Sequence, residues 1–295
     1  MKRLLLLSFF LFSLSLANAE LKVATLHPLI TDLAKQVGGN KVTVVGLMKP
    51  GADPHAFSPT PGQLASVSNA KLILASGKGM ETYLPKMQDN LSAGQRILEV
   101  GRRVPSLKIS GKDELFVCCP AHSVGGLDPH WWHSPSAMQR ATLIVAEEFS
   151  KADPANAATY KANADAYRSK LRQLDSWAKK QFSVIPRSKR KLTTSHLAFG
   201  YLCRDYGFKA LPVQGLTRER NASPSYLAEA ISQIKKQKIP AVFPEQLANP
   251  KVLKAMVSET GVKLGGTLIA DGSVSSWEKM FQHNVSTIVR GLSES

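Results

Sequence analysis

One uninterrupted stretch near the middle of the chain limits how the rest can be arranged. Residues 155–182 contain neither glycine nor proline and are rich in Ala, Lys, Arg, Gln and Leu, which are strong helix formers. Asp153 and Pro154 stand directly before them, as an N-cap residue and a first-turn proline do. We therefore expect one helix of about 28 residues, roughly 40 Å long at 1.5 Å per residue, which is enough to run along two lobes.

Short apolar runs alternate with helix-like patterns on both sides of this stretch. Before it, the expected strands are 21–25, 41–48 and 71–75, and the expected helices are 28–37, 61–69 and 136–149. After it, the expected strands are 191–194, 209–213, 241–243 and 262–265, and the expected helices are 198–206, 224–237, 250–259 and 276–290. Such alternation is typical of parallel sheets covered by helices.

The predicted fold class is therefore α/β. We expect two lobes, each with a mostly parallel sheet flanked by helices, joined by a long rigid backbone helix and separated by a cleft. The expected boundaries are 20–153 for the N-terminal lobe, 154–183 for the linking helix and 184–295 for the C-terminal lobe.

The first 19 residues have the pattern of a secretory signal peptide. Lys2 and Arg3 form a basic start, residues 4–16 an apolar core, and 17–19 the sequence Ala-Asn-Ala of a cleavage site. No later apolar run is long enough to span a bilayer. No cysteine follows the cleavage site closely enough for lipid attachment. We expect cleavage after residue 19 and a monomeric mature chain that is free in a periplasm.

The chain is basic, with a formal net charge of +16. A basic balance can indicate nucleic-acid binding, but here the lysines and arginines are spread along the whole sequence. Only residues 186–191 form a cluster, which we interpret as a solvated linker. We therefore expect no nucleic-acid partner.

Three of the seven histidines stand in similar surroundings: His55, His130 and His196 each follow a turn or strand end and precede a helical pattern. In an open α/β sheet such positions face the crevice outside the carboxyl ends of the strands. Asp-Pro-His occurs twice, at 53–55 and 128–130, and the proline stiffens the backbone before the imidazole. Asp271 follows the strand-like run 267–270 and could supply a fourth donor. Three imidazoles and one carboxylate suit tetrahedral zinc, whereas manganese prefers more oxygen.

Other side chains near these motifs leave alternatives open. His133 lies one helical turn after His130 and could share its ion or only surround it. Glu245 could be a rival ligand or the acceptor for a ligand histidine's second nitrogen. His122 could assist metal capture, and Trp131 and Trp132 are interpreted as walls of the cleft.

The three cysteines cannot all pair within one chain. Cys118 and Cys119 are neighbours, and a bond between neighbours closes a strained ring. A bridge from one of them to Cys203 is therefore the expected disulfide, if geometry allows it. No C-x-x-C spacing exists, so the sequence gives little support to a redox-enzyme function.

Five motifs occur together in one order: residues 27–39, 53–55, 128–131, 195–201 and 243–251. In these motifs, and over nearly all of the mature chain, the sequence resembles the zinc- and manganese-binding substrate-binding proteins of ABC importers. The resemblance implies that His55, His130, His196 and Asp271 hold a metal ion between the lobes. It further implies a zinc-type member, because manganese members are expected to carry glutamate at the position of His196.

The resemblance implies a function in transport and not an enzyme. The protein would capture Zn(II) in the cleft and deliver it to the membrane permease of an ABC importer, with supply by a metallochaperone left open. One alternative is a manganese-type binding protein. The other is a zinc-dependent hydrolase, if Asp271 left the fourth position open and Glu245 acted as the base.

Overall fold

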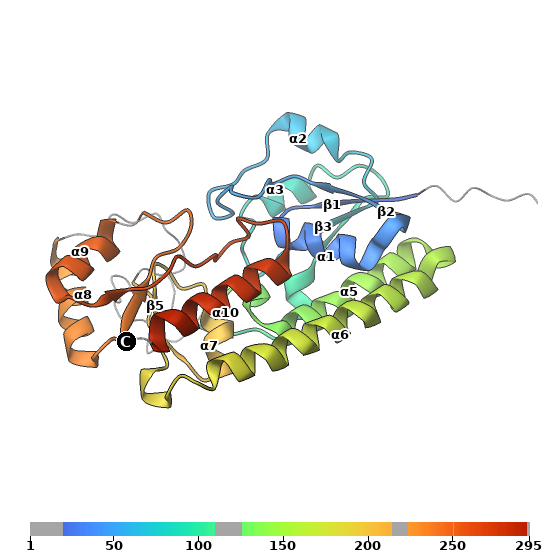
Figure 1. Ribbon diagram of the computed structural model, residues 1–295. Coiled ribbons are helices and arrows are strands. Elements are labelled where there is room, and N and C mark those ends of the chain that lie inside the picture. Colours follow the sequence, from blue (N-terminus) through green and yellow to red (C-terminus); the bar gives the residue numbers. More distant parts are fainter. Residues whose placement is uncertain (1–19, 110–125, 214–223, 250, 294–295) are drawn as a thin grey trace, which may run out of the picture.

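Figure 1 shows the computed structural model, which describes residues 20–109, 126–213, 224–249 and 251–293. Two sheets of four parallel strands organise these residues. The first has the strand order β2-β1-β3-β4, and the second has the order β6-β5-β7-β8. Helices flank both sheets (Figure 1). The predicted fold class is confirmed.

The first sheet is built on a buried apolar strand. Its strands are β1 (Leu21–Thr25), β2 (Val42–Gly46), β3 (Leu72–Ala75) and β4 (Arg96–Glu99), and its helices are α1 (Pro28–Gly38), α2 (Pro61–Ser66) and α3 (Leu84–Gln88). Val23 of β1 pairs with Val44 on one side and Leu72 on the other. Strand β4 was not predicted, because a half-exposed run with a charge at each end lacks an apolar pattern.

The second sheet has shorter strands. They are β5 (Lys191–Thr194), β6 (Lys209–Ala210), β7 (Ala241–Phe243) and β8 (Lys263–Leu264), accompanied by helices α7 (Gly200–Tyr206), α8 (Pro224–Gln237), α9 (Lys251–Thr260) and α10 (Trp277–Ser293). The edge strands β6 and β8 end earlier than predicted. The strand-like run 267–270 forms only an isolated bridge, in which Leu268 pairs with Glu245.

Two long helices lie side by side beneath the sheets (Figure 1). They are α5 (Pro135–Ala152) and α6 (Ala157–Phe182). Pro154–Asn156 forms a 3-10 turn, so the α-helix starts slightly later than predicted. The buried residues of α6 recur every three or four positions: Tyr160, Ala164, Tyr167, Leu171, Leu174, Ala178 and Phe182. This stripe faces α1, α5 and α10, so α6 contacts helices on both sides of the molecule. The lobe boundaries stay a prediction.

Arg190 differs from the solvated linker predicted for residues 186–191. Its guanidinium donates hydrogen bonds to the backbone carbonyls of Phe182 and Ile185 at 2.9 and 3.1 Å, and to that of Tyr206 at 3.0 Å. Carbonyls at a helix end lack partners within the helix. Arg190 thus closes the end of α6 and ties it to α7. Arg187, by contrast, is exposed.

No helix among the described residues is both long enough and apolar enough to cross a membrane.

Candidate metal centre

Four side chains from distant parts of the chain meet between the two sheets. His55, His130, His196 and Asp271 each bring one donor atom into a group whose members all lie within 4.8 Å of one another. The Nε2 atoms of His130 and His55 are 3.3 Å apart, and the Asp271 carboxylate lies 3.5 to 3.9 Å from the three imidazoles. Tetrahedral zinc with bonds of about 2.0–2.1 Å needs donors roughly 3.3 Å apart. The group is close to that spacing.

Two of these residues precede the long helices in the sequence, and the other two follow them. His55 lies on the loop between β2 and α2, and His130 immediately precedes the 3-10 helix Trp131–His133. His196 follows β5, and Asp271 lies between β8 and α10. The side chain of His55 is 8% exposed, whereas the other three are fully buried. The loop of His55 is therefore the side from which solvent reaches the group.

A buried carboxylate holds His130 in place. One oxygen of Asp128, Oδ1, accepts the backbone N–H of His130 at 2.8 Å and lies 2.9 Å from its Nδ1. Burial raises the pKa of Asp128 to about 7, although the His130 backbone bond opposes this rise. The same local turn recurs at His55, whose N–H donates to Oδ1 of Asp53 at 3.0 Å.

Glu245 plays the corresponding part for His196. Its Oε1 accepts the backbone N–H of His196 at 3.0 Å, and its Oε2 contacts the Nδ1 of the same ring. The opposite nitrogen, Nε2, lies 3.6 Å from Asp271. Of the two interpretations of Glu245, the structure therefore supports the acceptor and not the rival ligand.

His133 does not join the group. Its Nε2 lies 2.8 Å from the carbonyl oxygen of Ala270, which can only accept, so this nitrogen carries the proton. The ring also packs on Phe199 with centroids 4.4 Å apart. Burial lowers the pKa of His133 to about 3, and the charge of His130 acts in the same direction. The interpretation of His133 as a shared ligand is wrong, because its ring is directed at the backbone before Asp271.

The two tryptophans are part of the core and not of an open cleft wall. Both are fully buried. Trp131 donates from Nε1 to the carbonyl of Ser76 at 3.1 Å, and Trp132 donates to that of Ala270 at 2.9 Å. The Trp132 ring also packs behind His130, at 5.4 Å between centroids.

The segment before Asp271 is held by side chains more than by a strand ladder. Asn284 of α10 accepts the backbone N–H of Ile269 and donates to its carbonyl, both at 2.8 Å. Ala270 receives the two ring N–H groups of Trp132 and His133. Trp132 and His133 were singled out from the sequence, but their bonds to Ala270, 138 and 137 residues away, leave no local signal. Asn284 was missed because no local pattern marks it.

Cys203 is a buried free thiol in this structure, and the expected bridge to it stays a prediction. It lies on the buried face of α7, and burial raises the pKa of its thiol. Its proposed partners Cys118 and Cys119, like His122, lie outside the described residues.

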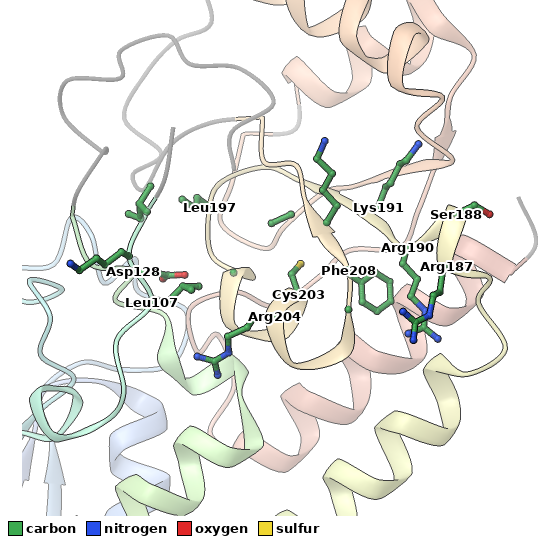
Figure 2. A pocket seen from close by; sticks show the side chains of 16 residues that line it. Leu107, Asp128, Arg187, Ser188, Arg190, Lys191, Leu197, Cys203, Arg204 and Phe208 are labelled. Carbon is green, nitrogen blue, oxygen red and sulfur yellow. The ribbon is translucent and has the colours of Figure 1, made fainter. Parts of the chain in front are cut away.

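A cavity of about 680 Å³ opens beside Asp128 (Figure 2). Cys203 and Phe208 line it together with basic residues that include Arg187 and Arg204. None of the four residues of the group lines this cavity. It is therefore distinct from the candidate metal centre.

The chain is similar to known metal-binding proteins. The family model ZnuA, described as the periplasmic component A of a zinc-uptake complex, matches residues 23–291. The iron-binding protein YfeA of Yersinia pestis is 32% identical over 285 residues, which cover 93% of this chain and 87% of YfeA. The manganese-binding lipoprotein MntA of Bacillus subtilis is 31% identical over 287 residues, which cover 94% of this chain and 91% of MntA.

Solved structures give the same result. The periplasmic zinc-binding protein TroA from Treponema pallidum aligns with a TM-score of 0.81 at 28% identity, covering 93% of this chain and 99% of TroA.

Proposed function

Since the chain belongs to the ZnuA family of periplasmic metal-uptake components, we propose that it captures Zn(II) and delivers the ion to the membrane permease of an ABC importer. The ion would be held by His55, His130, His196 and Asp271. The observation that carries this proposal is the meeting of three imidazole nitrogens and one carboxylate within 4.8 Å.

The relatives are metal-binding components of transporters and not enzymes. The zinc-hydrolase alternative is therefore dropped. The arrangement of the donors agrees with a transport function, because Asp271 reaches the position that a catalytic site would leave to water.

The choice of zinc is part of the proposal, because the relatives named above bind different metals by name: iron, manganese and zinc. Zinc is favoured here by the donor set. Three of the four donors are nitrogen, which suits zinc, whereas manganese suits carboxylate, carbonyl and water oxygens. His196, with its ring nitrogen fixed by Glu245, is the residue on which this choice depends most.

The cellular setting is also proposed. The pattern of residues 1–19 supports export to a periplasm with cleavage of the signal. There the protein would act as a monomer without a nucleic-acid partner. It would receive zinc directly from solution or from a metallochaperone.

Competitive binding tests the proposal. Protein stripped by a chelator should bind one Zn(II) per chain and should prefer it to Mn(II) and Fe(II) when each competes with a fluorescent chelator. His196→Ala and Asp271→Ala should each weaken zinc binding by more than the roughly 10–100-fold typical of losing a ligand's supporting partner. Asp165→Ala is the matched control for Asp271→Ala, because this aspartate is exposed on α6 and lies outside the group.

Two results would count against the proposal. Absence of stoichiometric metal would remove the metal-binding function, and a preference of the unaltered protein for Mn(II) would assign it to the manganese type.

A further inference from the structure

Two of the histidines are each held twice by one carboxylate. Asp128 accepts the backbone N–H of His130 and contacts its Nδ1, and Glu245 does the same for His196. All four residues are at most 4% exposed. The two pairs therefore have the same design, although Asp128 is two residues from its histidine and Glu245 is 49 residues away.

This arrangement selects one tautomer of each ring. When the carboxylate is ionised it can only accept, so the Nδ1 atom beside it then carries the proton. In a neutral imidazole the other nitrogen, Nε2, then keeps its lone pair. The Nε2 atoms of His130 and His196 lie 3.5 and 3.6 Å from Asp271, inside the candidate metal centre. Each ring therefore presents the lone pair of an unprotonated Nε2 to the centre before a metal ion binds.

We propose that Asp128 and Glu245 are the positioning residues of the metal centre, because each fixes the tautomer and direction of one histidine so that its Nε2 faces the ion. This inference rests on the proposed function and extends it to two residues outside the group of donors. Supporting partners of this kind commonly govern metal affinity.

The two pairs differ in one detail that makes the proposal testable. Asp128 uses the single oxygen Oδ1 for both contacts. Its Asn analogue can keep that oxygen in place and retain both bonds. Glu245 uses its two oxygens separately. Its Gln analogue must put an NH₂ group at one of the two positions. With the oxygen kept at the backbone N–H, that NH₂ group donates to Nδ1, so the neutral ring carries its proton on Nε2. A metal ion must displace that proton before Nε2 can bind it, which weakens the binding.

Gly200 at the start of α7 leaves room for the Asp128 carboxylate. A Cβ atom on Gly200 would lie 2.6 Å from Oδ2 of Asp128 and 2.9 Å from Cδ2 of Leu107. The next residue, Tyr201, donates from its hydroxyl to the carbonyl of Asp128 at 3.3 Å. Figure 2 shows Asp128 and Leu107 beside the helix that carries Cys203. The segment that carries His196 therefore also supports the partner of His130.

The experiment combines ¹⁵N NMR of the histidine rings in metal-free protein with zinc affinity of the same samples. In samples at pH 8, wild-type His130 and His196 should both show a protonated Nδ1 and an unprotonated Nε2. Asp128→Asn should keep this tautomer and lose less than about tenfold in affinity. Glu245→Gln should move the proton of His196 to Nε2 and lose about 10–100-fold. Gly200→Ala should perturb His130 and weaken binding, whereas the control Gly62→Ala, whose Cβ would meet nothing within 4 Å, should do neither.

Protonated Nε2 on either ring of the wild-type protein would overturn the proposal. This measurement is made on the wild-type protein, so it does not depend on whether a variant folds. An unchanged His196 tautomer in folded Glu245→Gln would overturn it as well. Wild-type rings with bare Nε2 in a protein that binds no metal would instead refute the proposed function, so the two failures can be told apart.

Discussion

Two histidines outside the candidate metal centre are kept unprotonated by burial without a nearby opposite charge. His27 is the N-cap of α1, where its Nδ1 accepts the backbone N–H of Leu29 at 3.2 Å. Burial lowers the pKa of His27 to about 3, and the charge of His133 adds to this effect. The pKa of His133 is likewise lowered to about 3 by burial. Both rings are therefore neutral in the folded protein well below pH 6.

This difference from the unfolded chain predicts acid sensitivity. An unfolded histidine titrates near pH 6.5. Between pH 6.5 and 3 the unfolded state therefore binds a proton that His27 does not bind in the folded state. The stabilisation is complete above about pH 6.5 and is lost as the pH falls toward 3. The slope is about 1.4 kcal/mol per pH unit for each such histidine. Asp128 acts in the opposite sense, because burial raises its pKa to about 7.

The variant His27→Asn isolates one of these protons, because asparagine also caps helices but does not titrate. In metal-free protein, urea unfolding between pH 6 and 4.5 should show a pH slope smaller by about one proton than in the wild type. The other titrating groups are common to both proteins and cancel in the comparison. Equal slopes would show that His27 is protonated in the folded state.

At the scale of elements, the run 267–271 shows how a segment without a strand ladder can still be fixed. Asn284 satisfies both backbone groups of Ile269. Trp277, at the start of α10, donates from its ring to the carbonyl of Trp132 at 2.7 Å and from its backbone to Asp32 of α1 at 2.8 Å. Helix α10 thus connects the backbone that carries Asp271 to α1 and to the turn after His130.

Asn284→Ala should loosen this connection. The change leaves two buried backbone groups of Ile269 unsatisfied, at about 1–3 kcal/mol each, so urea unfolding of metal-free protein should show a loss of about 2–6 kcal/mol. Zinc affinity should fall too, because Asp271 follows two residues later. Gln282→Ala on the exposed face of the same helix should change stability by less than about 0.5 kcal/mol. Similar losses for both variants would contradict this role of Asn284.

Elements with a strong local pattern could be predicted from the sequence, and those fixed by distant partners could not. Strands β1, β5 and β7 and helix α8 have the predicted bounds. Strand β4 was missed because its half-exposed residues carry no apolar pattern. The run 267–270 was predicted as a strand from its composition, but tertiary hydrogen bonds from α10 and from the turn at Trp131–His133 replace most of the ladder.

For the whole molecule, the important feature is that the candidate centre joins the chain before α5 to the chain after α6. His55 and His130 come from the first part, and His196 and Asp271 come from the second. In parallel sheets such meetings occur outside the carboxyl ends of the strands. An ion bound there would therefore connect the two parts directly.

The sequence predicted these four residues as a group, and the structure brings them together. The repeated Asp-Pro-His spacing also contained the signal for Asp128, since in both copies the aspartate accepts the N–H of the histidine two residues later. No local signal assigns Glu245 to His196 or places Gly200 against Asp128. The first contact joins the ends of the neighbouring strands β5 and β7 of one sheet, and the second brings α7 against the turn before His130.

The most direct test of the central claim is a crystal structure of zinc-loaded protein with diffraction recorded above and below the zinc absorption edge. We predict one anomalous peak per chain, about 2.0–2.2 Å from the Nε2 atoms of His55, His130 and His196 and from a carboxylate oxygen of Asp271. A peak elsewhere, or one bound by fewer than these four side chains, would contradict the account.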